Sequence, residues 1–271
     1  MNKINITVIL PIHKMNEDYK EMLINAINSM QDFYNDVIIM IVCPTDVKTE
    51  IDKIDLGEKF NIKYNVHTGD TDFCSQVNRG IGNCDTEWFS ILEVDDTYKP
   101  IWLKSINDYM KIYPDVDVFL PIVKDINTEG KFISFTNESA WAYGFSDRQG
   151  FIDNEVLLDF QNYQISGGLY RTQVIKDNGS LKENIKLTFG YEFLLRLTHN
   201  GVKVMTMPKI GYQHLNFRED SLFWGYKNNE STKLTENEVK FWLETAKREF
   251  FFKNKRSVLS KRFYFTIFLY L

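Results

Sequence analysis

Short apolar runs alternate with longer amphipathic segments over the first 122 residues of the chain. Each run is rich in β-branched and aromatic residues, which is typical of strands that are buried on both faces. Strands are predicted over residues 6–10, 36–43, 62–67, 87–94 and 116–122, and the pattern is weakest at 62–67. Between these runs, apolar residues recur at helical spacing and predict helices over 18–30, 73–83 and 100–113.

Strands that alternate with helices in this way form βαβ units. We therefore predict an α/β fold, with a Rossmann-like, mostly parallel central sheet flanked by helices. A further helix is predicted over residues 190–199, where Asn200-Gly201 ends it, and a further strand over 202–207. No internal repeat or low-complexity linker separates these segments. A single fused domain is expected.

Residues 123–163 are polar and aromatic, and no regular pattern assigns them to helices or strands. This stretch either packs against the sheet or faces an acceptor, and packing is the favoured interpretation for most of its aromatic residues. The following Ser166-Gly167-Gly168 is predicted to form a tight turn, since glycine lets the backbone approach other groups closely.

One predicted strand leads directly into three acidic residues. The segment from Trp88 is apolar as far as Leu92, and Glu93, Asp95 and Asp96 then follow within four positions. Carboxylates this close repel one another unless a cation neutralises them. The carboxyl end of a parallel strand is where α/β proteins bind ligands, and hard oxygen ligands suit Mg²⁺ or Mn²⁺ carrying a diphosphate. The alternative is a solvated acidic turn that caps the next helix.

Composition and charge narrow the classes of function. The net charge of −5 provides no overall basic field, which disfavours nucleic acid as a partner. Cys43, Cys74 and Cys84 include no CxxC pair, so reduced thiols in a cytoplasmic protein are favoured over a zinc site. The apolar stretch at 4–12 contains Pro11 and lacks a small-residue cleavage site, and it is interpreted as the first strand rather than a signal peptide.

Several short motifs follow one another along the chain. They are Pro11 after the first strand, Asn78-Arg79-Gly80-Ile81, Glu93-Val94-Asp95-Asp96, the segment 166–171, the segment 190–196, Gly201-Val202-Lys203-Val204 and Tyr212-Gln213-His214. In this order they resemble the family 2 glycosyltransferases, over about residues 4–222. The resemblance implies the nucleotide-sugar-binding GT-A fold and transfer of a sugar from a nucleotide-diphosphate sugar.

The resemblance also implies roles for individual residues. Asp95 is the best candidate for the metal ligand, with Asp96 beside it, and Glu93 replaces the family's first Asp and is expected to reach the ribose or a metal-bound water. The remaining donor-binding candidates are matched to the first strand, the helix that faces the nucleotide, the acidic segment and the glycine turn. They are Pro11, Ile12, His13, Asn78, Arg79, Val94 and Gly168.

The chain departs from the family pattern after the second strand. The family usually carries an Asp pair there, whereas this chain has Cys43-Pro44-Thr45-Asp46. The carboxylate beside the nucleobase is therefore either missing or supplied by Asp46, Asp70 or Asp72.

A second departure concerns the catalytic base. The Glu-Asp pair that the family often places before the helix is Phe189-Gly190 here. Glu192 is therefore the predicted base, and Glu183 in the preceding loop is the alternative. Glu192 is equally interpreted as an ordinary surface acid, which the helix dipole favours in a first turn.

Two residues after the predicted strand 202–207 are further candidates. The resemblance implies that His214 is a metal ligand or a diphosphate contact, although a lone histidine is more often structural. The planar fork of Arg218 suits diphosphate oxygens, and the alternative is an exposed arginine on a mobile loop.

The C-terminal residues 247–271 combine seven basic residues with many aromatic ones, and only Glu249 opposes them in charge. This composition suits the surface of an anionic membrane, which would place the protein peripherally on the cytoplasmic face. The alternative is a terminal helix that packs on the catalytic domain or on a second subunit of a homo-oligomer. We expect a GT-A domain over 1–222, with a nucleotide-binding half at about 1–122 and an acceptor-side half at about 123–222, and a helical extension over 223–271.

These features together predict a metal-dependent glycosyltransferase of the hexosyltransferase type. The donor is a nucleotide-diphosphate sugar, with a UDP-sugar favoured, the acceptor is a hydroxyl of a glycan or lipid-linked saccharide, and the cofactor is Mn²⁺ or Mg²⁺. The resemblance implies inversion at the anomeric carbon. One alternative is a nucleotidyltransferase, which usually has a glycine-rich loop that residues 11–15 lack. The other is a degenerate GT-A domain that binds without catalysis.

Overall fold

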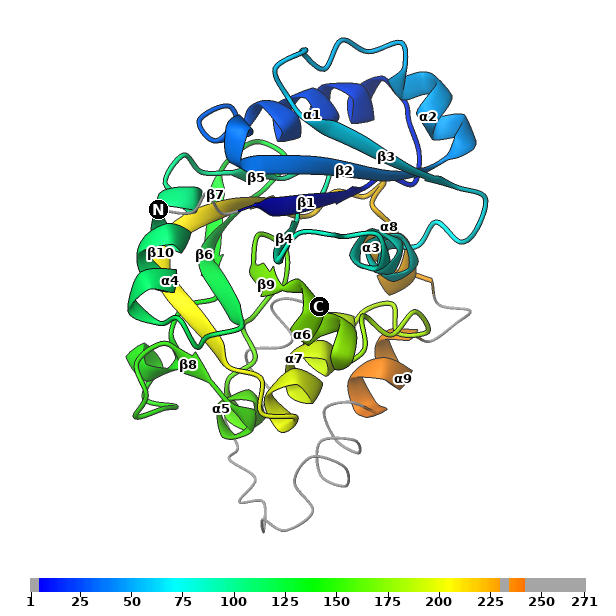
Figure 1. Ribbon diagram of the computed structural model, residues 1–271. Coiled ribbons are helices and arrows are strands. Elements are labelled where there is room, and N and C mark those ends of the chain that lie inside the picture. The colour runs from blue at the N-terminus through cyan, green and yellow to red at the C-terminus, as the bar shows by residue number, and fades with distance from the viewer. Residues whose placement is uncertain (1–4, 230–233, 242–271) are drawn as a thin grey trace.

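The computed structural model describes residues 5–229 and 234–241. In this part of the chain, one sheet has the strand order β3-β2-β1-β4-β9-β6-β10-β5, with β7 paired to β6 and β8 to β10 (Figure 1). The strands are β1 (Ile6–Pro11), β2 (Val37–Pro44), β3 (Ile62–His67), β4 (Trp88–Ile91), β5 (Thr97–Tyr98), β6 (Val118–Ile126), β7 (Phe132–Thr136), β8 (Phe151–Ile152), β9 (Leu169–Arg171) and β10 (Val204–Leu215).

The longest strand pairings are parallel, as the alternating pattern predicted. Strands β3, β2, β1 and β4 run in the same direction, and β6 and β10 form a second parallel pair. Strand β9 joins the two groups, because it pairs antiparallel with β4 on one side and with β6 on the other. The α/β fold is therefore confirmed, with antiparallel additions at the centre and the edges.

Helices cover both faces of the sheet (Figure 1). They are α1 (Glu17–Asn28), α2 (Thr45–Ile51), α3 (Phe73–Gly82), α4 (Trp102–Ile112), α5 (Asn154–Asp159), α6 (Thr172–Asp177), α7 (Phe189–His199), α8 (Leu222–Lys227) and α9 (Leu234–Lys240). Helices α1, α2 and α4 share one apolar core with Val8 and Leu10 of β1. Helices α3, α5, α6 and α7 share the other core with Ile9. Alternate residues of the same strand thus stabilise both layers.

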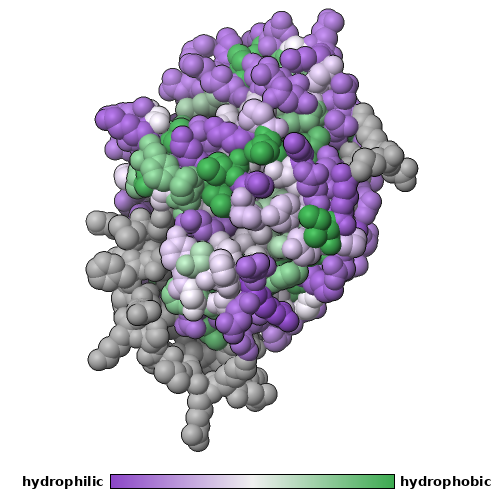
Figure 2. All heavy atoms as spheres, turned by 90° about the vertical axis from the view of Figure 1, so that its left-hand side faces the viewer, coloured by the Kyte–Doolittle hydropathy of each residue, from purple (hydrophilic) through white to green (hydrophobic). Residues whose placement is uncertain are grey.

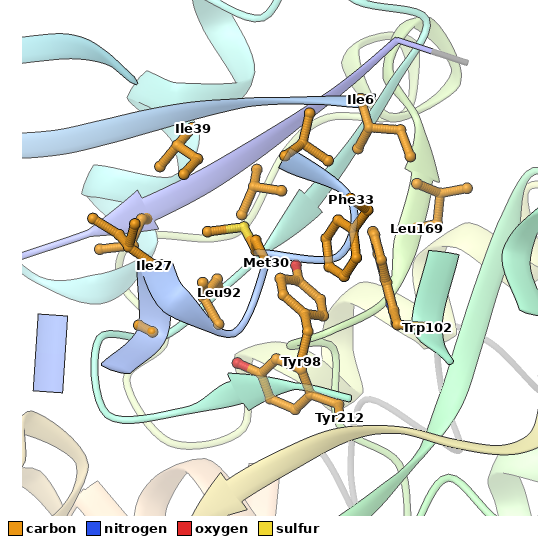
Figure 3. Packing of buried hydrophobic residues seen from close by; sticks show 14 of the residues in the cluster. Ile6, Ile27, Met30, Phe33, Ile39, Leu92, Tyr98, Trp102, Leu169 and Tyr212 are labelled. Carbon is orange, nitrogen blue, oxygen red and sulfur yellow. The ribbon is translucent and has the colours of Figure 1, made fainter. Parts of the chain in front are cut away.

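An aromatic group lies beneath the tight turn that the sequence predicted at residues 166–168. Tyr98, Trp102 and Tyr212 pack together in the core (Figure 3), and the ring centroids of Tyr98 and Trp102 are 4.3 Å apart. Trp102 Nε1 donates a hydrogen bond of 2.8 Å to the carbonyl of Gly167, and the backbone N–H of Glu93 donates to the Tyr212 hydroxyl at 3.1 Å. The core therefore fixes both the turn and the start of the acidic segment.

We expect Gly167→Ala to lower the free energy of unfolding by about 3 kcal/mol, as measured by urea denaturation. Gly167 has φ +77°, and an added Cβ would lie 2.5 Å from the ring of Tyr212. Gly130→Ala is the matched control, since Gly130 has φ +75° and no atom within 4 Å of the added Cβ. An equal loss in both variants would show that the contact with Tyr212 adds nothing.

Several elements differ from the sequence prediction. Helix α2 begins directly after Pro44, which the prediction treated only as the end of a strand. Strands β7 and β9 are short antiparallel strands that no apolar run in the sequence predicted. Strand β10 continues to Leu215, because the register shift between Met207 and Ile210 carries it past Pro208.

The predicted C-terminal extension is described only in part. Helices α8 and α9 belong to it, whereas the basic and aromatic residues 247–271 lie outside the described residues. Among the helices described, none combines the length and apolar character needed to cross a membrane. Figure 2 shows the face that carries α4 and β10, where apolar side chains form small groups separated by hydrophilic ones. Such groups are ordinary on a protein surface.

Candidate functional site

A cavity of about 380 Å³ opens at the carboxyl ends of β1 and β4. The segment 161–166, the start of α7, the end of β10 and helix α8 complete its wall. It brings together seven of the residues that the sequence singled out, which are Pro11, His13, Glu93, Val94, Asp95, His214 and Arg218. The carboxyl edge of a parallel sheet is where α/β proteins bind ligands, so this cavity is the candidate site.

Two acids of the segment after β4 face the cavity. Glu93 accepts a hydrogen bond of 2.6 Å from Ser166 Oγ. Asp95, two positions further along the chain, also lines the cavity. Burial, followed by the negative charge of Asp95, raises the pKa of the Glu93 carboxyl above its usual value. A cation bound here would therefore reduce the repulsion between these two carboxylates.

Asp96 is placed differently from the sequence prediction. It is 1% exposed, does not line the cavity, and accepts a hydrogen bond of 2.9 Å from the backbone N–H of Leu215. Burial raises the pKa of its carboxyl above the usual value, and the positive charge of His214 opposes this rise. The structure therefore supports Asp96 as a link between the acidic segment and β10, and not as a metal ligand.

Arg218 lies against two acids at the cavity. Its Nε is 3.4 Å from Asp95 Oδ2 and 3.1 Å from Asp220 Oδ1. Its Nη2 donates a hydrogen bond of 2.6 Å to the Tyr19 hydroxyl, and its guanidinium carbon lies 4.6 Å from the centre of that ring. These contacts hold Arg218 in the cavity wall, so it is not an exposed residue on a mobile loop.

His214 forms an ion pair with a buried acid that the sequence did not single out. Its Nδ1 is 3.0 Å from Asp125 Oδ1, and Asp125 Oδ2 accepts hydrogen bonds from Ser134 and Thr136. Burial alone would lower the pKa of His214, but the charge of Asp96 and the hydrogen bond to Asp125 outweigh it and raise the pKa to about 10. A protonated imidazole has no lone pair for a metal. In this state His214 suits an anionic ligand instead.

The end of β1 contributes Pro11 and His13 to the cavity, whereas Ile12 is fully buried in the apolar core. Burial, followed by the positive charges of Lys14 and Arg218, lowers the pKa of His13 to about 4. His13 is therefore neutral at physiological pH and can both donate and accept a hydrogen bond. Ile12 supports the site from below and does not reach it.

The remaining donor-side candidates from the sequence lie outside the cavity. Asp46 is exposed on α2, and the alternative Asp72 caps α3 by accepting from the N–H of Ser75 at 3.2 Å. The amide of Asn78 exchanges two hydrogen bonds of 2.9 Å with the backbone of Leu181, so it fastens α3 to a distant loop.

Two more candidates have roles in packing. Arg79 lies against Gly69, where an added Cβ would be 2.2 Å from its Nη2. At Gly168 an added Cβ would be 2.6 Å from the Tyr170 hydroxyl, and Ser90 Oγ donates to the Gly168 carbonyl at 2.6 Å. A glycine is therefore needed at 168 for internal packing, which is a different reason from the predicted contact with a donor sugar.

The predicted base, Glu192, is engaged in a buried ion pair. It is 2% exposed, and its two oxygens lie 2.7 and 3.0 Å from the Nε and Nη2 of Arg196, one helical turn further on. Arg196 in turn donates to the carbonyls of residues 178–180. Glu192 does not line the cavity. The structure therefore supports a stabilising role for Glu192 and does not support a catalytic one.

The alternative base, Glu183, also has a structural contact. Its Oε1 accepts a hydrogen bond of 3.0 Å from Asn78 Nδ2, and Glu183 is absent from the cavity wall. Phe189 and Gly190, which stand where the family often has two acids, do line the cavity.

Further cavity residues come from regions that the sequence left unassigned. All six residues of the segment 161–166 line the cavity. Asn137, which is fully buried with φ +64°, holds this segment by accepting from the N–H of Gln164 at 2.8 Å and donating to its carbonyl at 3.1 Å. Gln76, in the helix α3 that the sequence did predict, also lines the cavity, and its Oε1 has no hydrogen-bond partner among the described residues. A buried acceptor of this kind can accept a hydrogen bond from a ligand.

The oxygen atoms that line the cavity suit a divalent metal that is coordinated mainly by the phosphates of a bound substrate. Among the described residues, no group of three His, Cys, Asp or Glu side chains could hold a metal alone. Mg²⁺, however, is commonly bound through one or two carboxylates together with substrate phosphates. Asp95 and Glu93 offer such carboxylates at the cavity surface.

A family model described as glycosyl transferase family 2 matches residues 7–177, which is more than half of the 271 residues. The chain belongs to glycosyl transferase family 2. Membership confirms the family and the glycosyltransferase class that the motifs predicted, and it argues against the nucleotidyltransferase alternative. Among curated proteins, none matches the chain.

Solved structures of S. aureus TarS resemble this family 2 member in fold. TarS 1-349 in complex with UDP-GlcNAc has 16% identity and a TM-score of 0.59, and the match covers 88% of this chain and 67% of that one. TarS 1-349 in complex with UDP has 17% identity and a TM-score of 0.59 over 91% and 74% of the two chains. A longer TarS chain has 15% identity and a TM-score of 0.57, and the match covers 88% of this chain and 44% of that one. The GT-A fold is therefore confirmed.

Proposed function

We propose that this protein transfers a sugar from a nucleotide-diphosphate sugar to a hydroxyl of a glycan or lipid-linked acceptor. The observation that carries the proposal is the Asp95 carboxylate, which faces a cavity at the carboxyl end of β4 with Arg218 3.4 Å away. A diphosphate needs positive charge to leave, and an acid that can hold a metal beside a fixed guanidinium supplies it.

The donor that we favour is a UDP-sugar. TarS, which shares the fold, is described in complexes with UDP-GlcNAc and with UDP. In this chain, the neutral His13 and Gln76 Oε1, which is unpaired among the described residues, are polar groups available to a nucleobase or ribose on the β1 side of the cavity. These two groups could form hydrogen bonds with the nucleotide in place of the carboxylate that the family usually carries after its second strand.

We propose Mn²⁺ or Mg²⁺ as the cofactor, held by Asp95 with Glu93 beside it. When bound, the metal would neutralise charge that develops on the leaving diphosphate. Arg218 would orient the diphosphate oxygens through its planar fork. The protonated His214 would donate a further hydrogen bond to the same anion, and its pair with Asp125 keeps the ring oriented.

Inversion at the anomeric carbon, which the family resemblance implies, is part of this proposal. The hexosyltransferase type is proposed as well. A peripheral position on the cytoplasmic membrane face and a homo-oligomer are also proposed, and these two depend on the composition of residues 247–271.

A second candidate function is nucleotide-sugar binding without transfer. It is favoured by Phe189-Gly190 standing where the family often has an acid pair, and by the engagement of Glu192 with Arg196. In that case the cavity would keep its donor affinity, but no carboxylate at the start of α7 would accept the acceptor's proton.

A thermal-shift screen separates these possibilities. We expect UDP or a UDP-sugar to raise the melting temperature, and Mn²⁺ to increase the shift, because ligands that bind only the folded state stabilise it. Incubation with the stabilising donor and mixed glycan acceptors should then release the nucleoside diphosphate. Stabilisation without release would support the binding domain, and no shift with any nucleotide would contradict both candidates.

A further inference from the structure

A carboxylate from the C-terminal extension occupies the start of helix α7. Glu238 Oε1 accepts from the backbone N–H of Lys186 at 2.7 Å, and Oε2 accepts from the N–H groups of Leu187 at 2.8 Å and Thr188 at 3.0 Å. The Thr188 hydroxyl donates to the same oxygen at 3.2 Å. Three consecutive amides and a hydroxyl thus converge on one side chain that lies about 50 residues away in sequence.

Of the three amides, that of Thr188 lies at the N-terminal end of α7, and those of Lys186 and Leu187 lie in the loop before it. Thr188 precedes the first residue of α7, and no side chain from the helix itself caps this end. The first N–H groups of a helix lack internal acceptors, and the positive end of the helix dipole favours a negative charge there. Glu238 is only 9% exposed, so its charge is balanced mainly by these donors.

The same loop forms one side of the cavity. Lys186, Leu187 and Thr188 line it, followed by Phe189 and Gly190 in the first turn of α7. The Lys186 ammonium lies 3.2 Å from Asp72, which caps α3 on the neighbouring wall. The segment that Glu238 holds is therefore part of the surface that a substrate would contact.

We propose that Glu238 is a positioning residue for transfer. Its carboxylate fastens the extension to the catalytic domain and fixes the wall at residues 186–190 in the geometry that the reacting groups require. The effect on activity rests on the proposed transferase function, whereas the contact itself can be tested without it.

Replacing Glu238 by Ala should free the three amides and loosen this wall. We expect hydrogen exchange of the segment 186–188 to accelerate and turnover to fall by roughly tenfold or more, since small misplacements of a site cost that much. Donor affinity should change by less than about threefold, because Asp95 and Arg218 keep their contacts. Glu236→Ala is the matched control, as Glu236 is exposed on the same helix.

Formate provides a readout that a general loss of stability would not change. In Glu238→Ala the vacated amides form an anion site, so formate should raise the melting temperature and restore turnover relative to chloride at equal ionic strength. The wild-type protein and Glu236→Ala should not respond. Equal effects of formate and chloride on Glu238→Ala would overturn the proposal.

If Glu238→Ala does not fold, Glu238→Gln gives the same test. The amide keeps the shape of the side chain but loses its charge, and an NH2 group that cannot accept a hydrogen bond replaces one of the two acceptor oxygens. Exchange at 186–188 should still accelerate, and unchanged exchange would overturn the proposal. Absence of transfer in the wild-type protein would instead count against the proposed function, and the exchange experiment would still decide the role of the contact.

Discussion

Asp95→Asn should lower the rate of sugar transfer by roughly 10²- to 10³-fold and remove the metal-dependent part of donor binding. The substitution keeps the shape of the side chain and removes the charge that would hold the metal against the diphosphate. The free energy of unfolding should change by about 1 kcal/mol or less, because the lost pair with Arg218 is offset by the relief of repulsion with Glu93. Transfer rates and calorimetric titration with and without Mn²⁺ measure the two effects.

Asp46→Asn is the matched control for this experiment. Asp46 is one of three acids that the sequence offers for the nucleobase side, but the structure has it exposed on α2 and outside the cavity. Donor affinity and transfer should both stay at the wild-type level. A loss of donor affinity in Asp46→Asn, with none in Asp95→Asn, would move the donor site away from the cavity described above.

Glu192→Ala should destabilise the fold by about 3 kcal/mol, because it leaves the guanidinium of Arg196, whose side chain is only 14% exposed, without its carboxylate. Turnover per folded molecule should be little changed, since Glu192 does not reach the cavity. Urea denaturation gives the stability, and transfer is compared at equal concentrations of folded protein.

Glu87→Ala serves as the control ion pair. Glu87 pairs with Arg171 at 2.8 Å, but its side chain is 67% exposed, so its removal should cost less than about 1 kcal/mol. If Glu192→Ala keeps its stability and loses turnover, Glu192 is the catalytic base and the structural assignment of its ion pair is wrong.

The sequence predicts the sheet well where strands are buried on both faces. The β-branched runs that became β1 and β2 need no tertiary information, because only a two-sided core explains them. Strand β9 could not be predicted, since Leu169–Arg171 is three residues long and its pairing with β4 and β6 depends on distant segments. Helix α2 was missed because Pro44 ends a strand and precedes a helix at the same time.

The candidate site was predictable only where charge or chemistry concentrates locally. Glu93 and Asp95 stand out in sequence because acids rarely follow a buried strand so closely. Asp125 does not stand out, because its importance comes from His214, 89 residues away. Glu192 was predicted to be the base, but the structure has it in an ion pair with Arg196. An acid one helical turn before an arginine has the same sequence pattern in both roles.

A crystal structure of the protein with UDP and Mn²⁺ would locate the donor site. We predict diphosphate density in the cavity, with Arg218 in contact with phosphate oxygens and with metal density beside the Asp95 carboxylate. The uracil should lie on the β1 side, near His13. A nucleotide bound elsewhere on the protein, or a diphosphate that contacts neither Asp95 nor Arg218, would contradict the account.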